Sequence, residues 1–103
     1  MINKKKQYLK RYLLQSKKID RYEKMEKRCT KEENTYKKYI SASINLRNEI
    51  EEKIQNIDDE LLIELLYEKY IFGKTLEEIA LILNYSKRHI ERLHIKALEK
   101  LEI

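Results

Sequence analysis

The sequence predicts an all-α protein, in which an N-terminal helical hairpin or coiled-coil-like extension precedes a small three-helix domain. The 103 residues contain no proline and a single glycine, which leaves little of the turn chemistry that connects strands. Charged residues make up 40% of the chain, and apolar residues recur at helical steps of three and four positions without the alternation of strands. A change in charge and pattern places the boundary between residues 1–57 and 58–103.

The N-terminal half of the chain carries the basic excess. Residues 1–56 hold 16 Lys and Arg against 8 Asp and Glu, whereas residues 57–103 hold 7 against 10. Within residues 1–31 the counts are 12 basic and 3 acidic. Such a helix can lie along phosphates or an acidic protein surface, and it is equally typical of an exposed helix that keeps a protein soluble. Its apolar side is largely tyrosine, which disfavours a membrane-surface role.

Apolar residues of this first region recur at steps of three, four or seven, which predicts helices packed against each other. They are Tyr8, Tyr12, Ile19, Tyr22, Cys29, Tyr36, Ile40, Ile50, Ile54 and Ile57. Polar residues such as Gln15, Glu26 and Glu33 interrupt the seam, and residues 30–33 have the form of a capping box. We therefore expect an antiparallel hairpin whose first helix ends near Arg28, and a homodimer formed through this region.

The composition disfavours an enzyme and a metal site. Cys29 has no partner for an internal disulfide, as expected in a reducing cytoplasm. His89 and His94 lie on one predicted helix and point about 140° apart, so they cannot share a metal ion. The sequence has neither a glycine-rich phosphate loop nor an apolar run long enough to cross a bilayer. We expect a cytoplasmic protein with no cofactor, no metal and no membrane partner.

The C-terminal region begins with a helix between Asp58 and Gly73. Asp58 or Asp59 can cap it, with Ile57 placed to pack on its first turn. Gly73 is expected to end it in the left-handed conformation. The apolar residues that should bury against the next helices are Leu61, Leu62, Leu65, Leu66 and Ile71.

Residues 75–101 predict two further helices joined by a short turn, the pattern of a helix-turn-helix. Thr75 and Glu78 can form a capping box for the first helix, and Ser86 can cap the second. Asn84 is the kind of residue that, after glycine, best tolerates the left-handed turn between them. The expected buried stripes are Leu76, Ile79, Ala80 and Leu83, then Ile90, Leu93, Ala97, Leu98 and Leu101.

The second stripe leaves a mostly basic face toward solvent. Arg and Lys near a helix N-terminus suit the major groove of DNA, where they donate to guanine edges and to phosphates. The candidate DNA-binding residues are Ser86, Lys87, Arg88, His89, Glu91, Arg92 and Lys96. His89 is expected near the DNA backbone and His94 at the rim of the core. A solvated charged face on an ordinary helical hairpin is the less favoured alternative, because both caps and the basic face occur together.

The segment from Leu65 to Leu101 resembles region four of bacterial sigma factors. The matching residues are Tyr70, Gly73, Thr75, Glu78, Ile79, Ala80, Leu83, Ser86, Ile90, Ala97, Leu98, Lys100 and Leu101. The whole chain is similar to the small stand-alone sigma-region-four-like proteins of Gram-positive phages and mobile elements. This resemblance implies a transcriptional regulator. It also implies a contact with RNA polymerase, because sigma region four docks on a helical tip of the polymerase β subunit. Asn84 replaces the usual glycine, which affects the strain of the turn and not its identity. Glu91 stands where many sigma factors carry a basic residue on the reading face, so their usual promoter element is not assumed.

We therefore expect a sequence-specific double-stranded DNA-binding transcriptional regulator, with residues 58–103 as the DNA reader and the basic residues 1–57 as the oligomerisation region. The alternative is a sigma-like interaction protein that binds RNA polymerase and modulates promoter use. A complete sigma factor is disfavoured, because the chain lacks the length and the aromatic-basic helix needed to melt promoter DNA.

Overall fold

The computed structural model describes residues 2–28 and 33–103, with the side chains of residues 26–28 and 33–35 left out. Throughout the described ranges the regular structure is helical, which confirms the predicted all-α class. The elements are α1 (Ile2–Arg28), α2 (Glu33–Gln55), α3 (Glu60–Leu66), η1 (Tyr67–Ile71), α4 (Leu76–Leu83) and α5 (Lys87–Lys100). The expectations for Cys29 and for the capping box of residues 30–33 fall outside the described residues, as do those for the side chains of Glu26 and Glu33.

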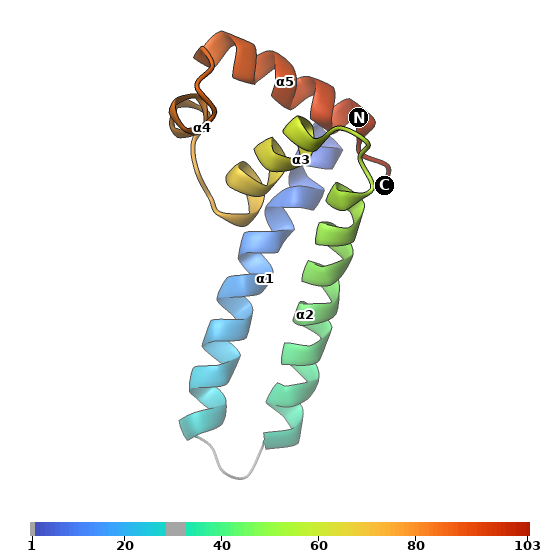
Figure 1. Cartoon of the computed structure of the whole chain (residues 1–103). Coiled ribbons are helices and arrows are strands. Elements are labelled where there is room, and N and C mark those ends of the chain that lie inside the picture. The colour runs from blue at the N-terminus through green and yellow to red at the C-terminus, as the bar shows by residue number, and fades with distance from the viewer. Residues whose placement is uncertain (1, 29–32) are drawn as a thin grey trace.

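Helices α1 and α2 run antiparallel and form the long arm of the molecule (Figure 1). Leu9, Tyr12 and Ile19 are buried on α1, and Ile50 and Ile54 are buried on α2. The remaining predicted seam residues that are described on these two helices, Tyr8, Tyr22, Tyr36 and Ile40, are half-buried. The helical period of three and four therefore identified the inner face of the hairpin, although Leu9 was not among the predicted residues.

Farther along the arm, polar and aromatic contacts replace aliphatic packing. Gln15 and Ser43 are buried, and Arg47 donates from Nη1 to the Ser16 hydroxyl at 3.2 Å. Its guanidinium carbon lies 5.7 Å from the ring centroid of Tyr12. Buried polar groups of this kind add less stability than well-packed apolar side chains would.

Asp59 caps the start of helix α3, which resolves the choice between two neighbouring aspartates. The Asp59 carboxylate accepts from the backbone N–H groups of Leu61 and Leu62, at 3.0 and 3.4 Å. The helix then widens into the π-helical segment η1, where the N–H of Phe72 donates to the carbonyl of Tyr67 at 3.0 Å. Gly73 follows with φ of 73°, as the left-handed end of the segment.

Helices α4 and α5 are bounded by the predicted caps. Thr75 and Glu78 form the capping box with reciprocal bonds of 3.2 and 3.1 Å. Asn84 adopts φ of 61°, and the N–H of Tyr85 reaches back to the carbonyl of Ala80 at 3.0 Å, which is the six-to-one bond of a Schellman C-terminus. The Ser86 hydroxyl accepts from the N–H of His89 at 3.2 Å and starts α5.

The hairpin and the C-terminal helices share one apolar core. Helices α3 and α5 lie across the end of the hairpin near both termini (Figure 1), and the buried cluster joins Leu9 and Ile54 of the hairpin to Leu62, Ile79 and Leu98. Its other buried members are Tyr12, Ile50, Ile57, Leu65, Leu66, Tyr70, Ala80, Ile90, Ala97 and Leu101. The molecule measures 52 × 26 × 21 Å, and its long dimension comes from the hairpin.

Candidate nucleic-acid interface

Helix α5 presents the predicted site residues on its solvent side. Ser86, Lys87, Arg88, His89, Glu91, Arg92 and Lys96 are all exposed. Ile90 and Leu98, on the opposite side of the helix, are fully buried. Because the buried stripe fixes the rotation of α5 about its axis, it also fixes which side chains can reach a ligand.

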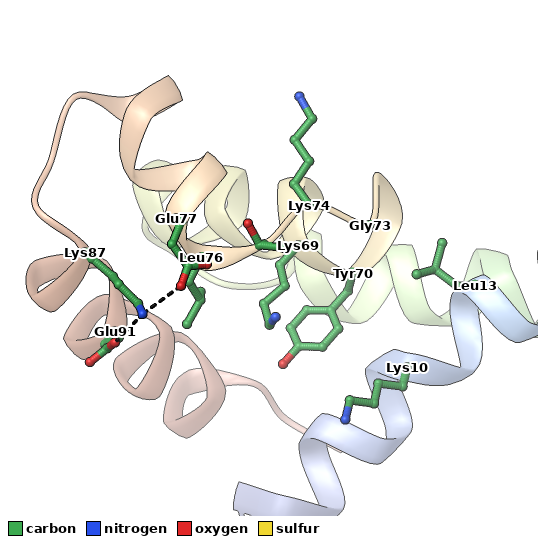
Figure 2. Close-up of a pocket in the computed structure, with 11 residues that line it drawn as sticks. Lys10, Leu13, Lys69, Tyr70, Gly73, Lys74, Leu76, Glu77, Lys87 and Glu91 are labelled. Atoms are coloured by element: carbon green, nitrogen blue, oxygen red, sulfur yellow. Dashed lines mark ion pairs between the residues drawn. The ribbon is translucent and has the colours of Figure 1, made fainter.

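Lys87 and Glu91 are engaged with each other and with α4. The Nζ atom of Lys87 lies 2.7 Å from a carboxylate oxygen of Glu77 and 4.0 Å from one of Glu91 (Figure 2). The hydrogen bond and charge of Glu77 raise the pKa of Lys87, and the same hydrogen bond from Lys87 lowers the pKa of Glu77. The positive charge of Lys87 is therefore partly balanced within the protein.

The more available cations are Arg88, Arg92 and Lys96. Among the described residues, none of these three side chains forms an ion pair or a hydrogen bond with another side chain. Ile95 adds an apolar group to the outer side of α5, with 46% of its surface exposed. Sequence reasoning did not select Ile95, although its spacing of three from Arg92 places it on the same face of the helix.

The turn before α5 carries Tyr85, an aromatic residue that was not among the predicted site residues. The rings of Tyr85 and His89 lie 4.9 Å apart between centroids, and both side chains are exposed. Ser86 lies between them in the sequence, and its hydroxyl is used as the helix cap. Tyr85 and His89 therefore form a small aromatic edge at the N-terminal end of α5.

The expectation that His94 lies at the rim of the core is wrong, because only 5% of its surface is exposed. Its Nε2 atom shares a hydrogen bond of 2.7 Å with the hydroxyl of Tyr70. Burial, together with the charges of Lys69 and Lys6, lowers the pKa of His94 to about 4, and burial raises the pKa of Tyr70 to about 12. Both groups are thus neutral near pH 7 and join η1 to α5.

A cleft of about 500 Å³ opens beside the start of α5, between α1, η1 and α4 (Figure 2). Lys10 and Leu13 of α1 border it together with Lys69 of η1 and Lys87 of α5. Sequence reasoning missed this site, because Lys10 and Lys69 are far apart in the chain and no local pattern joins them. It left the role of the basic first helix open.

Two further kinds of site have no counterpart among the described residues. Within residues 2–28 and 33–103, His, Cys, Asp and Glu side chains do not gather into any group of three or more that would suit a metal ion. No helix in these ranges combines the length and the apolar character needed to cross a bilayer.

Comparison of the chain with protein-family models, with curated proteins and with solved structures finds no match in any of the three.

Proposed function

We propose that the protein is a sequence-specific double-stranded DNA-binding transcriptional regulator, in which α4, the turn at Asn84 and α5 act as a helix-turn-helix. The observation that carries this proposal is the face of α5. A capped helix, held by buried Ile90 and Leu98, projects exposed Arg88 and Arg92 away from the core. Arginine is the side chain most often used to read guanine in the major groove.

The dimensions of α5 support the same proposal. Its 14 residues give a length of roughly 21 Å at 1.5 Å per residue, which suits a helix lying in a groove about 12 Å wide. Exposed Ile95 lies on the same side as the two arginines and can contact a thymine methyl group. Arg88, Arg92 and Ile95 together offer polar and apolar contacts to base edges.

A second candidate function is a sigma-like interaction protein that binds RNA polymerase. The observation that favours it is the apolar outer side of α4, where Leu81 is 84% exposed and Ile82 is 49% exposed. Phe72, just before α4, is 62% exposed. Neighbouring exposed apolar side chains, such as Leu81 and Ile82, can mark a protein contact. The resemblance to sigma region four makes the polymerase the first partner to test.

Selection from randomised duplex DNA separates the two candidates. We expect the full chain to enrich a defined motif, and the double variant Arg88→Ala, Arg92→Ala to lose that enrichment. A matched control is Lys37→Ala, Lys38→Ala, which removes the same charge from exposed positions of the hairpin. Flat enrichment by the wild-type chain, with polymerase capture that is lost in Leu81→Asp, would instead support the interaction protein.

We also propose that the regulator acts as a homodimer on DNA. Paired readers bind half-sites whose centres lie about 34–36 Å apart, one helical turn of DNA. Sedimentation velocity with a selected duplex should give two chains for each duplex, and the motif should contain two related halves. One chain per duplex, on a motif without internal symmetry, would contradict the dimer and leave the DNA-reading function standing.

A further inference from the structure

Lys10 and Lys69, from distant parts of the chain, border one cleft beside α5, and Lys6 lies near enough to Lys69 to act on it electrostatically. Lys6 and Lys10 are four residues apart on α1, which places them on one face of that helix. Lys69 belongs to η1, and Figure 2 shows its side chain extending into the cleft bordered by Lys10. Its Nζ atom lies 5.6 Å from the ring centroid of Tyr70. We call Lys6, Lys10 and Lys69 the lysine cluster.

Positive charge outweighs negative charge around the Lys69 ammonium group. Burial lowers the pKa of Lys69, and the charges of Lys10 and Lys6 lower it further, whereas the opposing effect of Glu77 is the smallest of the four. Among the described residues, none of the three forms an ion pair. Three like charges held together in this way repel each other, so an anion that binds them would be favoured.

The other lysines of the same cleft differ from the cluster. Lys74 lies 3.2 Å from the carboxylate of Glu68, and in Figure 2 it extends away from the cleft. Lys87 is paired with Glu77 at 2.7 Å. The uncompensated charge is therefore concentrated where α1 meets η1.

The position of the cluster indicates what the anion is. The cleft is also bordered by Thr75 and Leu76 at the N-terminal end of α4 and by Lys87 and Glu91 of α5. In a helix-turn-helix bound to DNA, the first helix crosses the sugar-phosphate backbone while the second lies in the major groove. Lys10 and Lys69 share their cleft with the start of that first helix and with the flank of the second, which is where a backbone strand would pass if α5 lay in the groove.

We propose that Lys6, Lys10 and Lys69 form a binding site for backbone phosphate of the duplex whose major groove α5 enters. This inference rests on the proposed DNA-reading function and adds that α1 takes part in DNA binding directly. Lysine binds phosphate as a point charge and carries no information about the base sequence. The lysine cluster therefore supplies affinity and salt dependence, and the face of α5 supplies specificity.

The test compares two triple variants of equal charge. The cluster variant is Lys6→Gln, Lys10→Gln, Lys69→Gln, and the control variant is Lys17→Gln, Lys24→Gln, Lys37→Gln. The control positions are exposed in the hairpin arm. Affinity of each full-length variant is measured by fluorescence anisotropy between about 50 and 200 mM salt, on a selected duplex and on a random one.

We expect the cluster variant to lower the slope of log affinity against log salt by about 0.9 for each lost contact, and so by up to about 2.7. It should weaken binding to both duplexes alike, since phosphate contacts are blind to sequence. The control variant should keep the wild-type slope. A cluster variant whose slope equals that of the control would overturn the inference, while motif enrichment by the wild-type chain would keep the proposed function.

Two further measurements distinguish a contact with DNA from an effect on folding. Replacing mutually repelling lysines should leave the thermal midpoint unchanged or raised, so a loss of slope in a folded variant reports on DNA contact. In the wild-type chain, NMR titration of the Lys69 ammonium group should show its pKa rising when the duplex is added. An unchanged pKa would overturn a direct contact. A wild-type chain that binds no DNA would overturn both the inference and the proposed function.

Discussion

At the scale of single residues, the arginines and the lysine of α5 should differ in how they affect specificity. Arg88 and Arg92 start the exposed face of the helix, whereas Lys96 lies farther along it. We expect Arg88→Ala or Arg92→Ala to cost about 1–3 kcal/mol on the selected duplex and less on random DNA, as for side chains that touch base edges. Lys96→Ala should weaken both alike. Paired anisotropy titrations on the two duplexes measure the difference. If an arginine variant lost the same affinity on both duplexes, that arginine would contact only phosphate.

A second residue-scale prediction follows from the buried His94. Its pKa is about 4 in the folded chain, against an ordinary value of 6.5. Between these values the unfolded chain binds a proton that the folded chain does not, so stability is fully present above pH 6.5 and is lost as pH falls toward 4. We expect this group to make the free energy of unfolding fall by up to about 1.4 kcal/mol per pH unit in that window. Urea unfolding at a series of pH values measures it.

The control for this effect is a glutamine in place of each histidine. His94→Gln keeps a group that can bond to the Tyr70 hydroxyl but cannot titrate, so the dependence on pH should flatten relative to the wild-type chain. His89 is exposed, and His89→Gln should leave the dependence unchanged. If His94→Gln and the wild-type chain lost stability in parallel as the pH fell, acidic side chains would be the source.

At the scale of elements, the turn between α4 and α5 depends on one backbone conformation. Asn84 has φ of 61°, which glycine adopts at no steric cost and other L-residues adopt with strain. Asn84→Gly should therefore change stability little or raise it by a few tenths of a kcal/mol, whereas Asn84→Ala should lower it by about 1 kcal/mol. Chemical unfolding monitored by circular dichroism distinguishes the two. Equal effects of Gly and Ala would show that the asparagine side chain, and not the backbone conformation, stabilises the turn.

The same scale shows how much of the structure the sequence could predict. Thr75, Asn84 and Ser86 were identified because each acts on backbone groups within four residues, so local sequence holds the information. The π-helical segment η1 was not predicted, since its wider turn leaves no distinct pattern in side-chain type. The Tyr70–His94 bond was missed for a different reason, because only the packing of η1 against α5 brings the two rings together.

The candidate site likewise has one part that the sequence could predict and another that it could not. The exposed face of α5 could be predicted because one apolar stripe determines which side faces out. The pairing of Lys87 with Glu77 could not, since it joins two helices across a turn. The lysine cluster depends on contacts over some sixty positions of sequence between α1 and η1. Periodicity says nothing about such contacts.

At the scale of the whole molecule, the hairpin and the C-terminal helices behave as one packed body at their junction. Leu9 of α1 is fully buried in the cluster that contains Leu62 and Leu98. The Nζ atom of Lys5 donates to the carbonyl of Glu99 at 3.2 Å, which closes the junction at its edge. The free energy that holds α5 in place therefore comes in part from α1.

This junction leads to the last prediction. Leu9→Ala removes a fully buried side chain and should lower the free energy of unfolding by about 2–5 kcal/mol. Because α1 and α5 share that core, hydrogen exchange followed by mass spectrometry should speed up in α5 as well as in α1. Ile19→Ala is the matched control, since Ile19 is buried within the polar part of the arm, and its effect should be greatest in α1 and α2. Faster exchange confined to the hairpin in Leu9→Ala would mean that α3 to α5 fold without support from α1, and the lysine cluster would then join two independent units.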